Sequence, residues 1–178
     1  MLQNWKFFFG KVNQTTRDVL ESAVGLCASR THYEVEIEHY LMKLLDESDS
    51  DFQHIAKHFG VDKSRLSAEL SRSLDRMKTG NGRGPVLSQM IVRMLTESWL
   101  LGSVDYGAGQ IRSGFTVMAL FSNEDLTRIF DTPQMKEWLL TSLGGEFTPH
   151  TAEQFAAFLT TDAARWQKIA KQINVYLD

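Results

Sequence analysis

The chain has 178 residues, of which 43% are apolar and 23% charged, with 3 prolines and 12 glycines. This composition excludes a disordered tail or a collagen-like repeat, and the length is sufficient for a folded domain with a real core. A formal net charge of −3, with interleaved basic and acidic side chains, argues against a nucleic-acid partner.

The single cysteine, Cys27, excludes an internal disulfide and a thiolate metal cage. Residues 1–10 lack the basic region and the long apolar core of a signal peptide. The longest apolar stretch, residues 86–104, is interrupted by Arg93 and Glu97, which is typical of a helix in water rather than in a bilayer. We therefore expect a cytoplasmic protein without a membrane partner.

The chain begins with four aromatic residues within five positions: Trp5, Phe7, Phe8 and Phe9. One face of a helix cannot bury all of them at once, so another surface must cover some of them. Two interpretations are compatible with each other. The segment is an extra helix that lies on the core, or it forms one wall of a groove that accepts an apolar helix from a partner.

A weak internal repeat follows. The segment from Thr15 predicts a helix with one apolar stripe: Val19, Leu20, Ala23, Val24 and Cys27. Adding 75 to these numbers gives a similar stripe: Met94, Leu95, Ser98, Trp99 and Gly102. The same shift takes the next predicted stripe, Ile37, Tyr40, Leu41, Leu44 and Leu45, to Arg112, Phe115, Thr116, Ala119 and Leu120. Two copies that each leave an apolar face uncovered are expected to pack as a pseudo-twofold pair.

Helix start and stop signals predict a four-helix unit used twice. Gly60 ends one predicted helix, and Asp62 is the expected N-cap of the next. Thr132 and Pro133 open a later helix, which Gly144 ends. The predicted boundaries are repeat one at about 13–78, a loop at 79–85 and repeat two at about 86–143. Because no useful period-2 stretch occurs, the predicted fold class is all-α.

Residues 146–178 form a predicted connector and a C-terminal amphipathic helix that has no counterpart in the repeats. Its apolar stripe comprises Phe155, Phe158, Leu159, Trp166, Ile169 and Ile173. This helix either docks as a ninth core helix or acts as an arm that binds something else.

The sequence offers no convincing active site. No G-x-x-x-x-G-K-[ST] phosphate loop occurs, and the run of Gly80, Gly82 and Gly84 is interpreted as a turn. His54 and His58 share a helix face at i, i+4, the geometry of a two-nitrogen metal clip, and a third ligand would have to come from Asp51 or another helix. Such pairs also occur by chance on solvated helix faces. We expect no cofactor, no metal and no enzymatic activity.

Residues 29–45, SRTHYEVEIEHYLMKLL, resemble the first repeat of the Clp N-terminal domain, and most closely that of the ClpV-type ATPases of type VI secretion. The matching positions are Leu20, Cys27, Ser29, Arg30, His32, Glu34, Val35, Glu36, Ile37, Glu38, His39 and Leu41. In the second repeat they are Asn81, Arg83, Pro85, Ser88, Trp99, Ile111, Arg112, Ser113 and Gly114. The resemblance covers Met1 to about Leu143.

This resemblance implies a double Clp repeat in residues 1–145 that recognises a protein for an ATP-driven unfolding ring. The implied partner is an apolar helix of the large subunit of the type VI sheath. The expected peptide-binding residues are Trp5, Phe8, Phe9, Val19, Ala23 and Val24. Because both ATPase modules are missing, the chain is expected to be the recognition domain of a longer protein. The alternative is a stand-alone adaptor or regulator that docks on a separate Clp ATPase.

Overall fold

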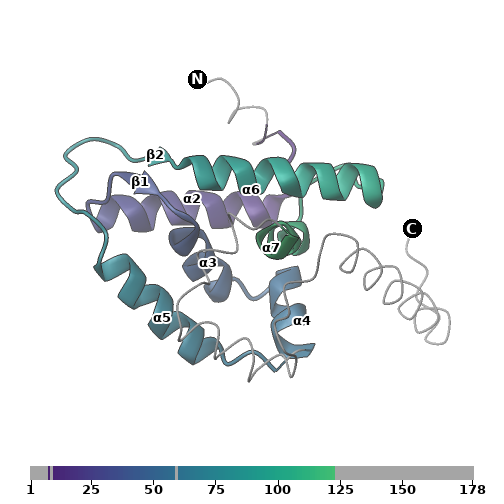
Figure 1. Cartoon of the computed structure of the whole chain (residues 1–178), viewed down its shortest axis with the longest axis horizontal. Helices are drawn as coiled ribbons and strands as arrows, with labels where there is room; N and C mark the ends of the chain where they lie inside the picture. The colour runs from purple at the N-terminus through teal and green to yellow at the C-terminus, as the bar shows by residue number, and fades with distance from the viewer. Residues whose placement is uncertain (1–7, 9, 59, 123–178) are drawn as a thin grey trace. The chain divides into compact units, whose positions relative to one another are not determined.

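The computed structural model describes residue 8 and residues 10–58 and 60–122. Its elements in chain order are α2 (Gln14–Ser29), β1 (Glu34–Val35), α3 (Ile37–Asp46), α4 (Asp51–His58), α5 (Lys63–Asp75), β2 (Val86–Leu87), α6 (Gln89–Leu100), the π-helix η1 (Leu101–Asp105) and α7 (Ser113–Ser122) (Figure 1). The two strands have two residues each and pair in parallel. The all-α fold class predicted from the sequence is confirmed.

The chain divides into two units, Met1–Gly145 and Glu146–Asp178, and all described residues belong to the first. Three predicted features lie outside the described residues: the extra N-terminal helix, the helix opened by Thr132 and Pro133, and the C-terminal amphipathic helix. Within the described part of the chain, no helix is both long and apolar enough to span a bilayer.

Local signals explain where the helices begin. The Asn13 side chain accepts a hydrogen bond from the Thr16 amide (2.9 Å) at the start of α2. Asp62 caps α5, as predicted, by accepting from the amides of Ser64 and Arg65. These side-chain oxygens satisfy amide groups that have no partner within the helix.

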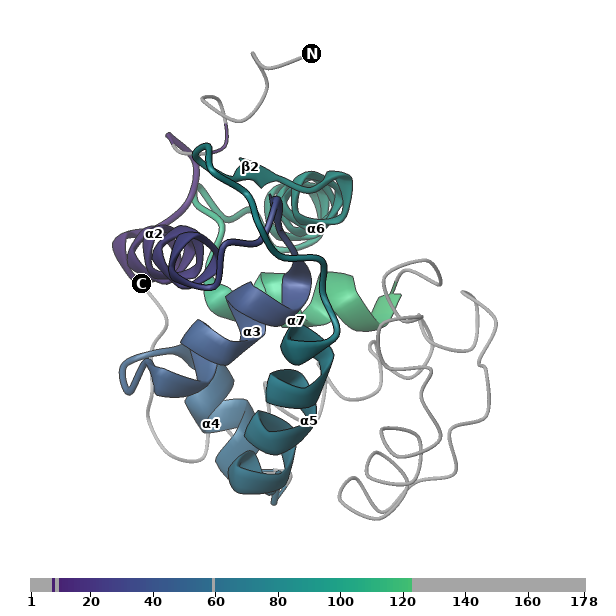
Figure 2. The same cartoon turned by 90° about the vertical axis from the view of Figure 1, so that its left-hand side faces the viewer.

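The described helices form three levels. In Figure 2, α2 and α6 lie above, α4 and α5 lie below, and α3 and α7 lie between them. The contacts agree with this order, since α3 touches α2, α4 and α5, while α7 touches α6 and α4. The core is therefore continuous and includes side chains from every level: Leu20, Ala23, Ile37, Leu44, Phe52, Leu70, Ile91, Leu95 and Leu120.

Two backbone bridges relate the repeats. Val35 pairs with Leu87 in the β1–β2 sheet, and Val12 pairs with Ile111 in an isolated parallel bridge. Val12 and Leu87 both precede the first helix of a repeat, whereas Val35 and Ile111 both precede its second helix. The segment before the first helix of each repeat thus pairs with the segment before the second helix of the other repeat. A pseudo-twofold arrangement requires this reciprocal pairing.

One residue is inserted in the first helix of the second repeat. Val12 and Leu87 are 75 positions apart, but Val35 and Ile111 are 76 apart. The extra residue lies in η1, since α6 and η1 together have 12 and 5 residues against 16 in α2. A π-helical turn is how a helix accommodates one additional residue. The constant shift of 75 that the sequence suggested is therefore wrong for the second helix.

With the shift of 76, Tyr40 of α3 corresponds to Thr116 of α7, and these two side chains touch. The Tyr40 hydroxyl lies 3.0 Å from Thr116 Oγ1, and both residues are fully buried. Two equivalent residues can contact each other only where they lie close to the pseudo-twofold axis. The pair therefore marks the centre of the interface between the repeats.

A second tie between the repeats joins α4 to the start of α7. The Asp51 carboxylate accepts hydrogen bonds from Arg112 Nη2 (2.6 Å), Arg112 Nε (3.1 Å) and the Gly114 amide (3.1 Å). In return, the Asp51 amide donates to Ser113 Oγ (2.9 Å). Although burial raises the pKa of Asp51, the hydrogen bonds from Arg112 and Gly114 outweigh it and hold the pKa below its ordinary value.

We expect Asp51→Asn to destabilise the protein by about 1–2 kcal/mol at neutral pH. The Arg112 side chain is 60% exposed, so most of this loss comes from the weakened cap on α7 rather than from the ion pair. Because the folded-state pKa of Asp51 is lowered, its contribution is present at neutral pH and is lost as the pH falls through that pKa. Urea unfolding at pH 7 and pH 3 measures both effects. Equal losses at the two pH values would contradict this assignment, and Asp49→Asn, an exposed neighbour, is the control.

Candidate functional site

The segment that leads into α2 is fixed against the second repeat. The carbonyl oxygen of Phe8 accepts hydrogen bonds from the amides of Lys11 (2.8 Å) and Val12 (2.9 Å). The Lys11 ammonium lies 4.7 Å from the centroid of a Trp99 ring, where a cation–π interaction is favourable. This junction holds Lys11 and Val12, which lead into α2, against Trp99 and Ile111 of the second repeat.

The six residues predicted from the sequence to bind a peptide are in different environments. Val19 and Ala23 of α2 are fully buried, Phe8 is 7% exposed, and Val24 is partly buried and packs against the core. Trp5 and Phe9 lie outside the described residues. Phe8, Val19 and Ala23 therefore support α2 from inside, and Val24 is the predicted residue on this helix that retains accessible surface.

The sequence block of residues 29–45 connects α2, β1 and α3 in the structure. The thiol of Cys27 donates to the carbonyl oxygen of Glu34 (3.2 Å), which holds the end of α2 against β1. Burial, with a smaller contribution from Glu36, raises the pKa of the Cys27 thiol to about 11. At neutral pH the group is a protonated thiol and not the thiolate that nucleophilic catalysis requires.

The two histidines of this block form a buried pair. His32 Nδ1 and His39 Nε2 are 2.8 Å apart, and the Glu36 amide donates to His39 Nδ1 (3.0 Å). Because Nδ1 of His39 accepts, its Nε2 carries the proton and donates to His32. Burial, followed by the charge of His32, lowers the pKa of His39 to about 4. The pair is therefore neutral at physiological pH and fixes the turn between α2 and α3.

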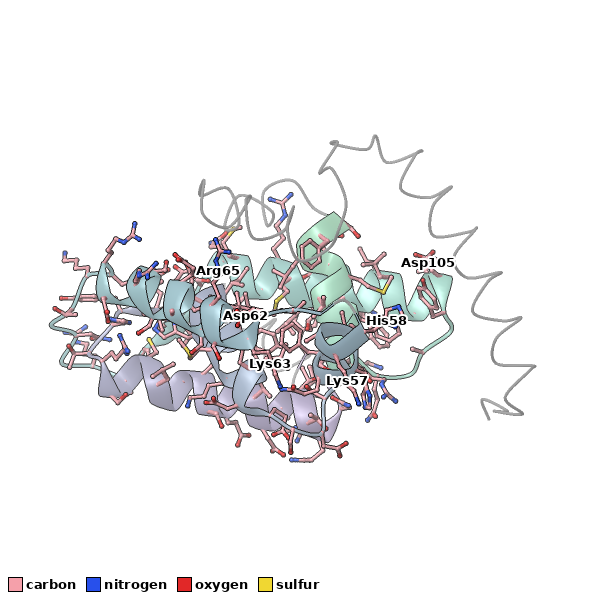
Figure 3. All side chains as sticks on the ribbon, turned by 90° about the horizontal axis from the view of Figure 1, so that it is seen from below. Lys57, His58, Asp62, Lys63, Arg65 and Asp105 are labelled. Atoms are coloured by element: carbon pink, nitrogen blue, oxygen red, sulfur yellow. The ribbon has the colours of Figure 1, made fainter. Side chains whose placement is uncertain are left out.

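The histidines proposed as a possible metal clip lie on α4. His54 and His58 are both exposed, and the described residues contain no group of three or more side chains placed to hold a metal ion. A shallow cavity of about 350 Å³ beside them is lined by Gln53, His54, Ala56, Lys57, Val61 and Lys63. Figure 3 shows Lys57 and His58 on α4 and Lys63 on α5, at the corner where the two helices meet.

Residues 11–131 match the sequence pattern of the Clp repeat (R) N-terminal domain. The chain belongs to this family. The double arrangement of α2–α3 and α6–α7 described above is its structural counterpart.

The similarity to ClpV-type N-terminal domains that the sequence predicted is also confirmed. The AAA+ ATPase ClpV1 of Pseudomonas aeruginosa is 31% identical over 139 residues, which cover 78% of this chain and 14% of that protein. The chain thus matches a small part of the length of this relative.

Two solved structures have the same fold. The N-terminal domain (1-163) of the ClpV1 ATPase from the E. coli EAEC Sci1 type VI system has a TM-score of 0.69 and 25% identity, with 88% of each chain covered. A complex of a ClpV N-domain with a VipB peptide has a TM-score of 0.65 and 27% identity, with 79% of this chain and 81% of that chain covered.

The sequence interpretation did not single out an exposed apolar group at the end of α6. Leu100, Val104 and Tyr106 are 49%, 74% and 52% exposed. Amphipathic periodicity cannot separate such residues from core positions, because both are apolar. The signal that could have found them is a position-by-position comparison of the two repeats.

Proposed function

We propose that this chain is the recognition domain of a ClpV-type chaperone and binds an apolar helix of the type VI secretion sheath. The chain contains no G-x-x-x-x-G-K-[ST] motif, so the proposal assigns ATP-driven disassembly of the sheath to AAA+ modules outside this sequence. The proposed site of action is the cytoplasm, where the sheath would be available.

The observation that carries this proposal is the likeness to the ClpV N-domain that was solved with a VipB peptide. The match extends over most of both chains, so the helices that could hold a peptide in that protein have counterparts here. In one recurring mode of peptide recognition, an amphipathic helix places its apolar face into a hydrophobic groove.

The proposed peptide surface consists of the aromatic start of the chain and the exposed side of α2. Trp5, Phe9 and Val24 are proposed as contact residues. Phe8, Val19 and Ala23, whose side chains are buried, are proposed as the floor of this surface. A double repeat within residues 1–145, followed by a connector and helix in residues 146–178, is the proposed domain organisation.

Trp5→Ala is expected to weaken binding of a sheath-derived helical peptide by about 1–3 kcal/mol, since a large aromatic anchor would be lost from the interface. Fluorescence anisotropy with a labelled peptide from the large sheath subunit measures the affinity. Tyr33→Ala is the control, because Tyr33 is an exposed aromatic residue in the turn between α2 and β1. If the Trp5 variant folds and binds like the parent protein, the aromatic start is not part of the site.

A further inference from the structure

Leu100, Val104 and Tyr106, here called the η1 patch, form an apolar surface at the end of α6. Leu100 ends α6, Val104 lies within η1, and Tyr106 follows η1 directly. About half or more of the surface of each residue is accessible to water. Single exposed apolar residues are ordinary, but three of them within seven positions form a patch that requires an explanation.

The first repeat shows that the fold itself does not require this patch. Leu100 corresponds to Gly25 by the shift of 75 that applies before η1. Tyr106 corresponds to Arg30 by the shift of 76, and each residue is the C-cap of its helix. The next residue has positive φ in both repeats: Thr31 (55°) after Arg30, and Gly107 (62°) after Tyr106.

Val104 lies within the turn that contains the inserted residue, and the same region of α2 holds Ala28 and Ser29, both exposed. The first repeat therefore places glycine, small residues and a charged residue where the second places leucine, valine and tyrosine. Since the two repeats share one scaffold, that scaffold does not itself require apolar side chains at these positions.

The η1 patch is also held in a fixed conformation. An added Cβ on Gly102 would lie 3.0 Å from the Phe115 ring, so η1 and α7 are in close contact. The Tyr106 ring packs on the same Phe115 at 5.6 Å between centroids. Short π-helical turns often occur at functional sites, and here the turn carries a preformed apolar surface.

Two carboxylates flank the η1 patch along the chain. Glu97 lies one helical turn before Leu100, and Asp105 lies between Val104 and Tyr106. Neither carboxylate forms an ion pair with any residue that the structure describes. Figure 3 shows Asp105 at the end of the continuous helix that α6 and η1 form.

We propose that the η1 patch is a second docking surface, which binds an amphipathic helix of another protein with lysine or arginine beside its apolar stripe. Leu100 and Val104 lie about one turn apart, so they form a ridge that fits between the side-chain rows of a partner helix. Glu97 and Asp105 would select basic flanks over acidic ones. The proposal for the η1 patch does not depend on the peptide groove proposed above.

The experiment uses two designed helical peptides as probes. Both carry leucine at i, i+3, i+4 and i+7, one with lysines beside this stripe and the other with glutamates at the same positions. Anisotropy titrations at low salt should show the basic probe binding about 10-fold or more tightly than the acidic probe. Val104→Asp should weaken binding of the basic probe by about 10-fold, although it adds a negative charge, because the apolar contact is lost.

Ala68→Asp is the control, since it places the same charge at an exposed position on α5, outside both proposed surfaces. It should leave binding of the basic probe unchanged. Equal affinity for the two probes, or equal effects of the Val104 and Ala68 variants, would overturn the proposal. Sedimentation of the chain alone tests a second copy as the occupant: self-association that Val104→Asp abolishes would also overturn it.

Discussion

Tyr40→Ala is expected to destabilise the protein by about 3–5 kcal/mol, the typical cost of removing a fully buried aromatic side chain. Tyr40 is fully buried, and it contacts its equivalent residue, Thr116, at the pseudo-twofold axis. The cavity would therefore open between the repeats, where both halves lose packing at once. Burial also raises the pKa of Tyr40, so its hydroxyl is protonated at neutral pH and can act as a hydrogen-bond donor.

Tyr40→Phe separates the ring from the hydroxyl. Thr116 Oγ1 donates to the carbonyl oxygen of Ser113 (2.7 Å), so Tyr40 must be the donor in the bond between the two hydroxyls. Its removal leaves Thr116 with one partner, and the expected loss is about 1 kcal/mol. Urea unfolding followed by circular dichroism measures both variants. A loss for Tyr40→Ala no larger than that for Tyr40→Phe would show that the interface between the repeats contributes little to stability.

The features that the sequence predicted well are those set by local interactions. The stripe of Val19, Leu20 and Ala23 predicts α2 because a 3.6-residue period is specific to an α-helix. Asp62 predicts the start of α5 because an aspartate N-cap acts within three residues of itself. The internal repeat was also recognisable, because each copy reproduces one apolar pattern.

Interactions between distant residues were not predictable in the same way. The apolar stripe of α2 does not state which neighbour covers it, so the sequence alone does not show that Val19 and Ala23 are fully buried. Asp51 and Arg112 are 61 positions apart, and no local pattern connects them. The residue inserted at η1 was missed because apolar periodicity tolerates a one-residue change in spacing.

The candidate functional residues also divide into those that local sequence patterns predict and those that they do not. The aromatic start was noticeable from composition alone, since four aromatic residues within five positions exceed what one helix face can bury. The η1 patch emerges only after the repeats are superposed with the correct shifts. The patch stands out because the two repeats share one scaffold but differ in the residues that they expose at equivalent positions.

Acidification from pH 6.5 to pH 4 is expected to destabilise the protein by about 2–3 kcal/mol through His39 alone. Burial, and then the charge of His32, lowers the folded-state pKa of His39 to about 4, from an ordinary value of 6.5. In this window the unfolded chain binds a proton that the folded protein excludes, so stability falls as the pH falls. The lowered pKa of His32 acts in the same direction. Glu36 acts in the opposite direction, because burial raises its pKa.

His39→Phe isolates the contribution of His39 from these other groups. The equivalent residue of the second repeat is Phe115, so an aromatic ring without nitrogen atoms is compatible with this position of the scaffold. At pH 7 the variant should be less stable than the parent protein, since the hydrogen bonds to Glu36 and His32 are lost. At pH 4 the difference should vanish or reverse, because the parent protein must then exclude a proton and the variant has none to exclude. Chemical denaturation across this range measures the difference, with exposed His54→Gln as the control. A constant difference at all pH values would mean that the buried histidine pair does not couple folding to protonation.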